Sequence, residues 1–577
     1  MTHPSLADAP PRTARPSWIV AVVAATVVLA VAIGSVLGSF LLTTRASGEL
    51  GAGAGYVTAD ALGFYEMRFD LPGEQRAQAI SFLSHFPGVD AETILGEELE
   101  RWLDDAMSES DTDFRYSTDI KPWFDGRVTF AMTSYPAGDM LGIVSSAIPT
   151  GVALLGVNDP AAAEAFGVRA RGEVESSAGG SFTSEAYAGT MIWSLDVSDD
   201  MTEIAPNLGF SYAVTDDHVL LATGADEIRT ALDVRDGRLP GMADDEELAG
   251  LLGRLPEDRV GTMATRSGPM IAEMRAALTE LDPALGSLVD VYESLIPELQ
   301  VGSARFAADR MVFETFSSLP PRGMGNAERD LAAHVPAGVL FYVEGDEVGE
   351  VVAEVVLAAK AGVADRPEAE QLALVEAALG GDLETFVEWM GSTALVAGWD
   401  GDAPYGGLVV SPTDEVQAAG RLAELRALAA LGATSEPGLM VEEVEHGDTT
   451  ITSISMETGD TFLPSVAVEY AIADGYVLIG IGEGFVARML DLDAADSLAA
   501  DDRYSDALEA TGGTSNAGVA WLDLAAVREA VEAALPPEIR QPYEADVQSW
   551  VQPFDYVIAV TVVEGDTATA IAAIVVR

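Results

Sequence analysis

Ala213–Ile228 reads AVTDDHVLLATGADEI, and Ala471–Val486 reads AIADGYVLIGIGEGFV; the two stretches align without a gap. Each stretch holds two apolar runs around a short polar turn, and a Gly then leads into a helix-like segment. Asp474-Gly475 is a two-residue hairpin signal in the second stretch, and two aspartates take its place in the first. The pattern predicts a β-hairpin followed by a helix, once in each half of the chain.

Further segments repeat outward from this hairpin in the same order in both halves. The matched pairs are Tyr56–Glu66 with His334–Glu344, the segment from Trp123 with that from Trp389, Gly151–Pro160 with Gly407–Glu415, and the final hairpins from Val301 and Val557. A fixed order of matches indicates an internal duplication. Because hairpins follow one another along the chain, the sheets are predicted to be antiparallel.

The duplication predicts two tandem α+β repeats, each an antiparallel sheet with helices. Repeat 1 is expected at residues 56–319 and repeat 2 at 334–577. Residues 320–333 are the predicted linker, because prolines and glycines there interrupt regular structure. The longer helical patterns cover Gly73–His85, Ile94–Met107, Gly349–Ala361, Pro367–Leu379 and Leu524–Ala534.

An apolar segment without charge, Trp18–Leu42, precedes the repeats. At about 1.5 Å per residue it would span roughly 37 Å, enough for a bilayer core of about 30 Å. It is longer than a signal-peptide core and has a poor cleavage site, so we predict an uncleaved transmembrane signal anchor. Arg12 and Arg15 before it favour a cytoplasmic N-terminus, although Arg45 follows it.

The predicted fold class is therefore α+β, with an N-terminal transmembrane helix followed by two tandem repeats. Residues 1–17 become a disordered cytoplasmic tail, 18–42 the anchor and 43–55 a flexible Gly/Ala-rich tether. The expected location is the plasma membrane, crossed once, with the C-terminal body outside the cytoplasm.

Composition excludes several functions. The chain has 577 residues, 31 Lys and Arg against 93 Asp and Glu, a formal net charge of −62, and no Cys. A surface this negative repels phosphate backbones, so no nucleic-acid partner is expected. Without Cys there are no disulfides, thiolate metal sites or Cys nucleophiles. The charge itself is explained by the solubility of an exposed domain.

The start of the body resembles a known family. Tyr56–Gly88 reads YVTADALGFYEMRFDLPGEQRAQAISFLSHFPG, which is similar to a bacterial, membrane-anchored family called domain of unknown function 3352. Its members show an anchor helix, a Tyr-x-Pro-Ala-Asp stretch and then Asp-Leu-Pro-Gly-x-Gln-Arg. In the first copy Thr58 stands where the family commonly has Pro, whereas the second copy has the Pro, at Pro336. The resemblance implies an envelope protein and no activity.

Four residues matched between the copies are the candidates for a site: Glu66, Glu344, Trp123 and Trp389. The two tryptophans precede equivalent strands, where matched aromatics are more often core anchors than ligand platforms. The two glutamates end aromatic strands, where a polar residue is readily solvent-facing. His218 aligns with Tyr476 and Tyr56 with His334, which predicts interchangeable, half-buried ring positions.

Other chemistry finds little support in the sequence. No pair of histidines has metal-ligand spacing, and no nucleophile elbow is present. The acidic stretches Asp491–Asp496, Glu109–Asp113 and Asp400–Asp402 are incomplete calcium loops. Gly480–Gly484 lacks the third Gly of a dinucleotide loop. No cofactor is expected.

The leading prediction is a non-enzymatic binding or structural module of the cell envelope. Its partners would be the membrane, through its own N-terminal helix, and an unknown envelope protein or apolar ligand. Two alternatives stay open: a carrier of lipid or another apolar ligand, and a hydrolase that uses two carboxylates with separated pKa values.

Overall fold

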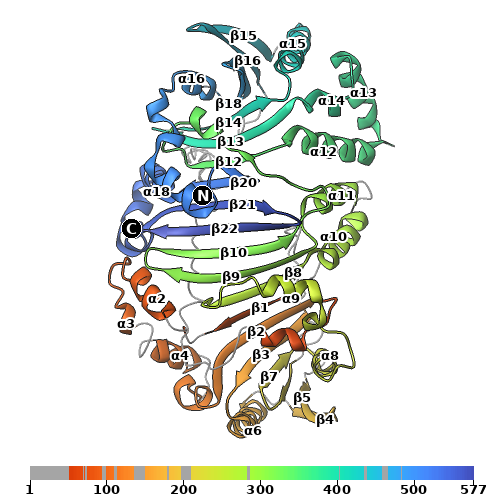
Figure 1. Cartoon of the computed structure of the whole chain (residues 1–577), viewed down its shortest axis with the longest axis vertical. Coiled ribbons are helices and arrows are strands. Elements are labelled where there is room, and N and C mark those ends of the chain that lie inside the picture. The colour runs from red at the N-terminus through yellow and green to blue at the C-terminus, as the bar shows by residue number, and fades with distance from the viewer. Residues whose placement is uncertain are drawn as a thin grey trace, which may run out of the picture.

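The computed structural model describes residues 51–577 apart from 69–70, 72–73, 94–98, 109–113, 135–149, 178–180, 197–209, 282–285, 365, 402, 435–437, 458–464 and 483. The predicted tail (1–17), anchor (18–42) and most of the tether lie outside the described residues. Within the described residues, helices lie to both sides of one long sheet (Figure 1).

Twenty described strands form a single antiparallel sheet. Strand pairing gives the order β4-β5-β6-β7-β3-β2-β1-β8-β9-β10-β22-β21-β20-β12-β13-β14-β18-β17-β16-β15. The strands of the first half are β1 (Gly63–Arg68), β2 (Phe124–Ser134), β3 (Thr150–Val157), β4 (Ser181–Tyr187), β5 (Thr190–Asp196), β6 (Ser211–Val214), β7 (His218–Ala222), β8 (Gly261–Arg266), β9 (Leu299–Ala307) and β10 (Arg310–Ser318).

The second half repeats this order of strands. Its strands are β12 (Phe341–Gly345), β13 (Met390–Asp400), β14 (Ala403–Pro412), β15 (Leu439–His446), β16 (Thr449–Glu457), β17 (Ser465–Ala473), β18 (Tyr476–Ile481), β20 (Gly518–Asp523), β21 (Phe554–Glu564) and β22 (Thr567–Val576). A separate pair, β11 (Ala327–Glu328) and β19 (Ser515–Asn516), ties the start of the second half to its end.

Each half also carries described helices between its strands. Those of the first half are η1 (Ala52–Tyr56), α2 (Gln75–Leu83), α3 (Ala91–Thr93), α4 (Leu99–Ser108), η3 (Tyr116–Ile120), α6 (Pro160–Ser177), α8 (Ala225–Arg235), η4 (Met242–Asp244), α9 (Glu246–Leu252), α10 (Ser267–Leu281) and α11 (Gly286–Leu295). Those of the second are η6 (Leu331–His334), α12 (Val348–Val363), α13 (Pro367–Leu379), α14 (Leu383–Val387), α15 (Glu415–Gly432), α16 (Phe485–Leu490), η7 (Ala494–Asp496), η8 (Leu498–Ala500), α17 (Asp502–Thr511), α18 (Leu524–Ala534), α19 (Pro537–Asp546) and α20 (Gln548–Val551).

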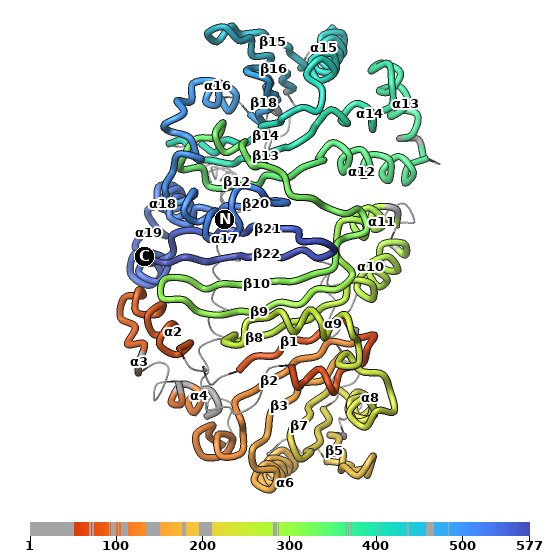
Figure 2. Tube along the Cα trace, viewed as in Figure 1, coloured from red at the N-terminus to blue at the C-terminus, as the bar shows by residue number. Residues whose placement is uncertain are grey.

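The halves meet along β10 and β22, which are the equivalent last strands of the two repeats. Arg310 lies opposite Val575, Glu314 opposite Ile571 and Ser318 opposite Thr567, so the register is symmetric about its centre. A pseudo-twofold axis therefore passes between Glu314 and Ile571. Figure 2 shows the result: blue strands from the end of the chain lie in the middle of the sheet beside β10.

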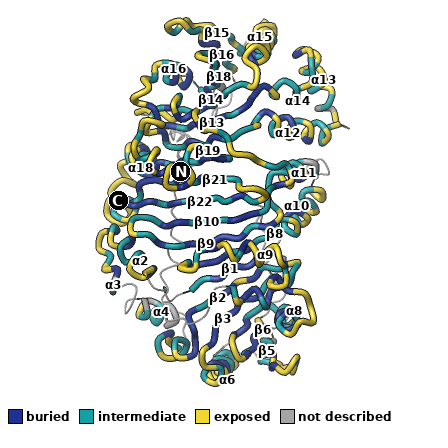
Figure 3. Tube along the Cα trace, in the orientation of Figure 1, coloured by how far each residue is buried: buried dark blue, intermediate teal, exposed yellow. Residues whose placement is uncertain are grey.

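Alternation along the strands builds a core on each face of the sheet. Val409 and Val410 are consecutive in β14 and fully buried, yet they belong to different apolar clusters. One face packs under η1, α8 and α9 in the first half and under η6, α16 and α17 in the second. Figure 3 shows these buried strands framed by exposed helices.

The predicted fold class is wrong in adding an N-terminal membrane helix to the two tandem repeats. Among the described residues, no helix is both long enough and apolar enough to cross a membrane. The two halves also share one sheet, because the free edges of β10 and β22 satisfy each other's backbone hydrogen bonds. The α+β class and the antiparallel sheet themselves are confirmed, and the predicted helices correspond to α2, α4, α12, α13 and α18.

Two segments expected to be irregular carry structure. The last tether residues form η1, where Ala54 is buried, so ordered packing begins before residue 56. The expected linker 320–333 contains β11 and the start of η6. Arg329 in this segment is buried and bonds to Asn516 of β19 and Asp346.

Candidate functional site

Glu66 holds the start of η1. It lies on β1 between Thr129 of β2 and Thr262 of β8, and it is 2% exposed. Its Oε2 accepts hydrogen bonds from the backbone N–H groups of Gly51 at 2.8 Å and Gly53 at 3.3 Å. Burial raises the pKa of the Glu66 carboxyl, while these N–H groups act in the opposite direction. The carboxyl thus caps a short helix.

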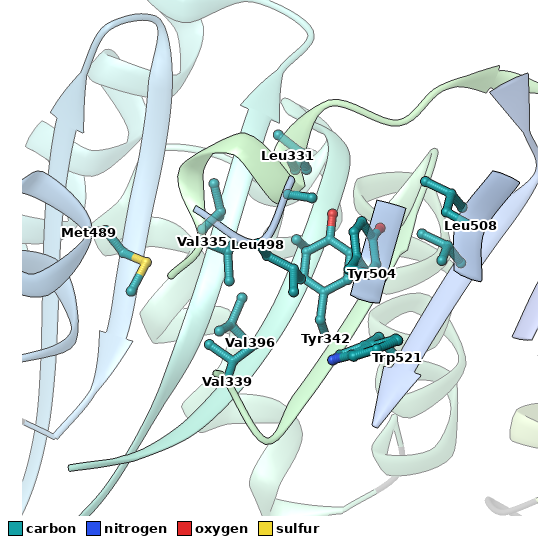
Figure 4. Close-up of a cluster of buried hydrophobic side chains, with 14 of the residues drawn as sticks. Leu331, Val335, Val339, Tyr342, Val396, Met489, Leu498, Tyr504, Leu508 and Trp521 are labelled. Carbon is teal, nitrogen blue, oxygen red and sulfur yellow. The ribbon is translucent and has the colours of Figure 1, made fainter. Parts of the chain in front are cut away.

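Glu344 takes the same place in the second half. It is 1% exposed, and the Tyr342 hydroxyl donates to its Oε2. Burial raises the pKa of Glu344 to about 7, against the opposing effects of Tyr342 and Arg329. Tyr342 lies beside Tyr504 above Trp521 in the core (Figure 4). The interpretation of both glutamates as solvent-facing is wrong, because η1 and η6 fold over their strands.

Trp123 and Trp389 lie on the other face of the sheet. They are 2% and 3% exposed, in clusters that contain Val128 and Val410 respectively. The Trp123 Nε1–H donates to the carbonyl of Asp119 at 2.7 Å. Both tryptophans therefore fill cores, and the structure brings neither close to a candidate glutamate.

A Tyr–His ring contact joins each short helix to the sheet. The helix carries the Tyr in the first half and the His in the second. Tyr56 of η1 meets His218 of β7 at 4.9 Å between ring centroids, whereas His334 of η6 meets Tyr476 of β18 at 3.9 Å. The predicted interchange is confirmed, although the first pair is fully buried rather than half-buried. The Tyr56 hydroxyl also donates to Asp217 at 2.6 Å.

The family-like stretch Tyr56–Asp60 lines a pocket of about 610 Å³. Its other walls come from β2, β3 and α8, and from the loop before η4. In Figure 1 the red segment that contains η1 lies over β2 and β3 beside α8. The remaining lining residues are Ala131, Thr133, Gly151, Val152, Asp226, Glu227, Thr230, Ala231, Leu239 and Pro240.

A second pocket, of about 420 Å³, occupies the equivalent place in the second half. In both halves a β-bridge follows the short helix, from Thr58 to Gly241 and from Pro336 to Ser497. The second pocket is lined by Pro336, Gly484, Ala487, Arg488, Asp491, Leu492, Asp493 and Asp496. The duplication thus produced a surface pocket twice, between the segment that follows the short helix, the helix after the hairpin and the following loop.

Sequence reasoning missed both pockets. Each is assembled from segments far apart in the chain, and no local pattern marks the hollow between them. The available signal was the Tyr-x-Pro-Ala-Asp stretch, because all five residues Tyr56–Asp60 line the first pocket. The Gln of the other family-like stretch is structural: Gln75 of α2 is buried and exchanges hydrogen bonds with the backbone of Phe306 in β9.

The acidic stretches do not assemble a metal site in the described part of the chain. No group of three or more His, Asp or Glu there could hold an ion. Asp491, Asp493 and Asp496 line the second pocket. Asp491 accepts a hydrogen bond from the His446 ring. The Glu109–Asp113 run and Asp402 lie outside the described residues.

Comparison with known proteins identifies the family. A family model described as protein of unknown function (DUF3352) matches residues 21–572. No curated protein and no solved structure matches the chain. The matched span contains the first repeat, residues 334–572 of the second, both glutamates and both pockets. The chain therefore belongs to the DUF3352 family of proteins of unknown function.

Proposed function

We propose that this chain is a non-enzymatic binding module, and that its two repeat-equivalent pockets receive small ligands. One observation carries the proposal: equivalent segments, namely the one after the short helix, the helix after the hairpin and the loop that follows it, line a pocket in each half, of about 610 Å³ and 420 Å³. Volumes of this order suit small molecules rather than extended polymers. The family-like Tyr56–Asp60 stretch forms a wall of the larger one.

A carboxylate-based hydrolase fits the geometry less well. Glu66 and Glu344 lie on β1 and β12, seven strand spacings apart, or roughly 34 Å at about 4.8 Å per spacing. Such enzymes need two carboxyl groups within about 10 Å of each other. Glu66 also binds backbone N–H groups, which leaves its carboxylate with a structural role.

A lipid carrier also finds less support than a small-molecule module. The cores on the helix-covered face are filled by large side chains such as Phe64, Tyr342 and Trp521, each at most 1% exposed. Both pockets carry carboxylates in their walls, which suit polar ligands rather than acyl chains.

The location at the cell envelope stays a prediction. It rests on the uncharged residues 18–42, which lie outside the described residues, and on the resemblance to a bacterial envelope family. Protease treatment of intact cells that express the chain with a C-terminal tag checks it. Removal of the tag is expected, and a tag protected until lysis would contradict it.

Ligand binding is tested by thermal unfolding of the full chain against a library of small metabolites. At least one compound is expected to raise the Tm, because a ligand that binds only the folded state stabilises it. The matched variant is Thr230→Arg, which places in the first pocket the residue that the second half carries at the equivalent Arg488. The proposal fails if no compound shifts the Tm. It also fails if every ligand-induced Tm shift is the same in wild type, Thr230→Arg and Arg488→Thr.

A further inference from the structure

We propose that the first pocket binds a small organic cation, with an ammonium or guanidinium group on an apolar body. This inference rests on the proposed binding function and names the ligand class for one of its two pockets. It follows from the wall chemistry of the first pocket and from what the second half places at the same positions.

The apolar part of the first pocket suits a compact hydrocarbon body. Ala131, Val152 and Ala231 form its inner wall and are at most 5% exposed. Leu239 lies at the rim and is 39% exposed. An apolar group placed in the pocket would bury the exposed part of Leu239.

The residues of this pocket that carry charge at neutral pH are all acids: Asp60, Asp226 and Glu227. Asp226 pairs with Arg229, which also reaches Glu185. Asp60 and Glu227 form no salt bridge with any described residue. The Glu227 Oε2 is buried and has no hydrogen-bond partner in the described structure. A half-buried carboxylate without a donor is unfavourable, and a cationic ligand in the pocket would supply the opposite charge.

The acidic composition of the whole chain does not account for a carboxylate at position 227, because the fold of the repeat does not require an acid there. In the gap-free alignment of the two hairpins, Glu227 falls on Phe485, which is fully buried in the core of the second half. Asp226 falls on Gly484 in the same way. The first half therefore keeps a half-buried carboxylate, with one buried oxygen, where its own duplicate uses an apolar ring.

The second pocket already contains a cation of its own. Thr230 corresponds to Arg488, whose guanidinium pairs with Asp400 and lies 4.5 Å from the Tyr405 ring centroid. Arg488 occupies part of the wall and supplies positive charge from within the chain. We therefore expect a free cation to bind the first pocket in preference to the second.

The test is fluorine NMR of the full chain with three probes that share one body and differ in charge: 4-fluorobenzylamine, 4-fluorobenzyl alcohol and 4-fluorobenzoate. The fluorine signal of the amine is expected to broaden on binding, and the amine should bind at least about tenfold more tightly than the alcohol. The benzoate signal should not broaden. Glu227→Gln should weaken amine binding about tenfold or more. Glu246→Gln, which removes an exposed acid from the first turn of α9 outside the pocket, should not.

Three outcomes would overturn the inference. If the alcohol or the benzoate binds as tightly as the amine, the pocket does not select a cation, and the proposed binding function stays intact. Amine binding that survives in Glu227→Gln, or falls equally in Glu246→Gln, would mean attraction to the acidic surface as a whole. Binding of none of the probes would retire the ligand class, and only failure of the metabolite screen as well would retire the binding function.

Discussion

Replacing Glu344 by Gln should change how the stability of the protein depends on pH. The pKa of Glu344 rises from an ordinary 4.5 to about 7 in the folded chain because the carboxyl is buried. A raised folded-state pKa favours the protonated form, so its stabilising contribution is complete below pH 4.5 and is lost as pH rises through about 7. A difference of about 2.5 pH units corresponds to about 3 kcal/mol. Gln mimics the protonated carboxyl and does not titrate.

The measurement is urea unfolding of wild type and Glu344→Gln at several pH values between 4.5 and 8. The stability of the variant relative to wild type should increase by about 3 kcal/mol across this range, since all other titrating groups cancel in the difference. Glu370→Gln, at an exposed position of α13, is the matched control and should run parallel to wild type. A Glu344→Gln curve that also runs parallel to wild type would refute the reasoning.

Gly53→Ala should destabilise the protein by about 1–3 kcal/mol, because the new Cβ would lie 2.4 Å from the Thr129 hydroxyl; Gly55→Ala, which meets open space, should be far milder in the same thermal unfolding assay. Residues 51–319 expressed alone should form dimers through β10, because the exposed strand edge can pair with its own copy as it pairs with β22. Sedimentation velocity checks this, and Glu314→Pro in the centre of β10 should return the fragment to monomers. A wild-type fragment that sediments as a monomer would contradict the expectation.

Much of the architecture could be predicted from the sequence because the duplication supplied an internal comparison. The aligned hairpins became β6-β7 and β17-β18, and the exchange of Tyr56 and His334 became two ring pairs. These predictions succeed because the side chains concerned are set by local alternation and by matched positions.

The failures share a physical cause, which is contact between segments distant in the chain. The Gly/Ala-rich residues before Tyr56 have the composition of a tether, yet their small size lets η1 pack against Thr129. That packing buries Glu66, a residue whose place at a strand end indicated exposure. The pairing of β10 with β22 and the two pockets depend on long-range geometry that strand and turn patterns do not encode.

The central position of β22 has a consequence for synthesis on the ribosome. Strand β10 is complete when only the first half has emerged, but its partner is made after the whole second half. Until then the nascent chain exposes an unpaired edge whose best match is the same edge of a neighbouring nascent chain. Closely spaced ribosomes on one message would thus favour strand exchange between chains. A chaperone, or wider spacing of the ribosomes, would protect the pairing of β10 with β22 of the same chain.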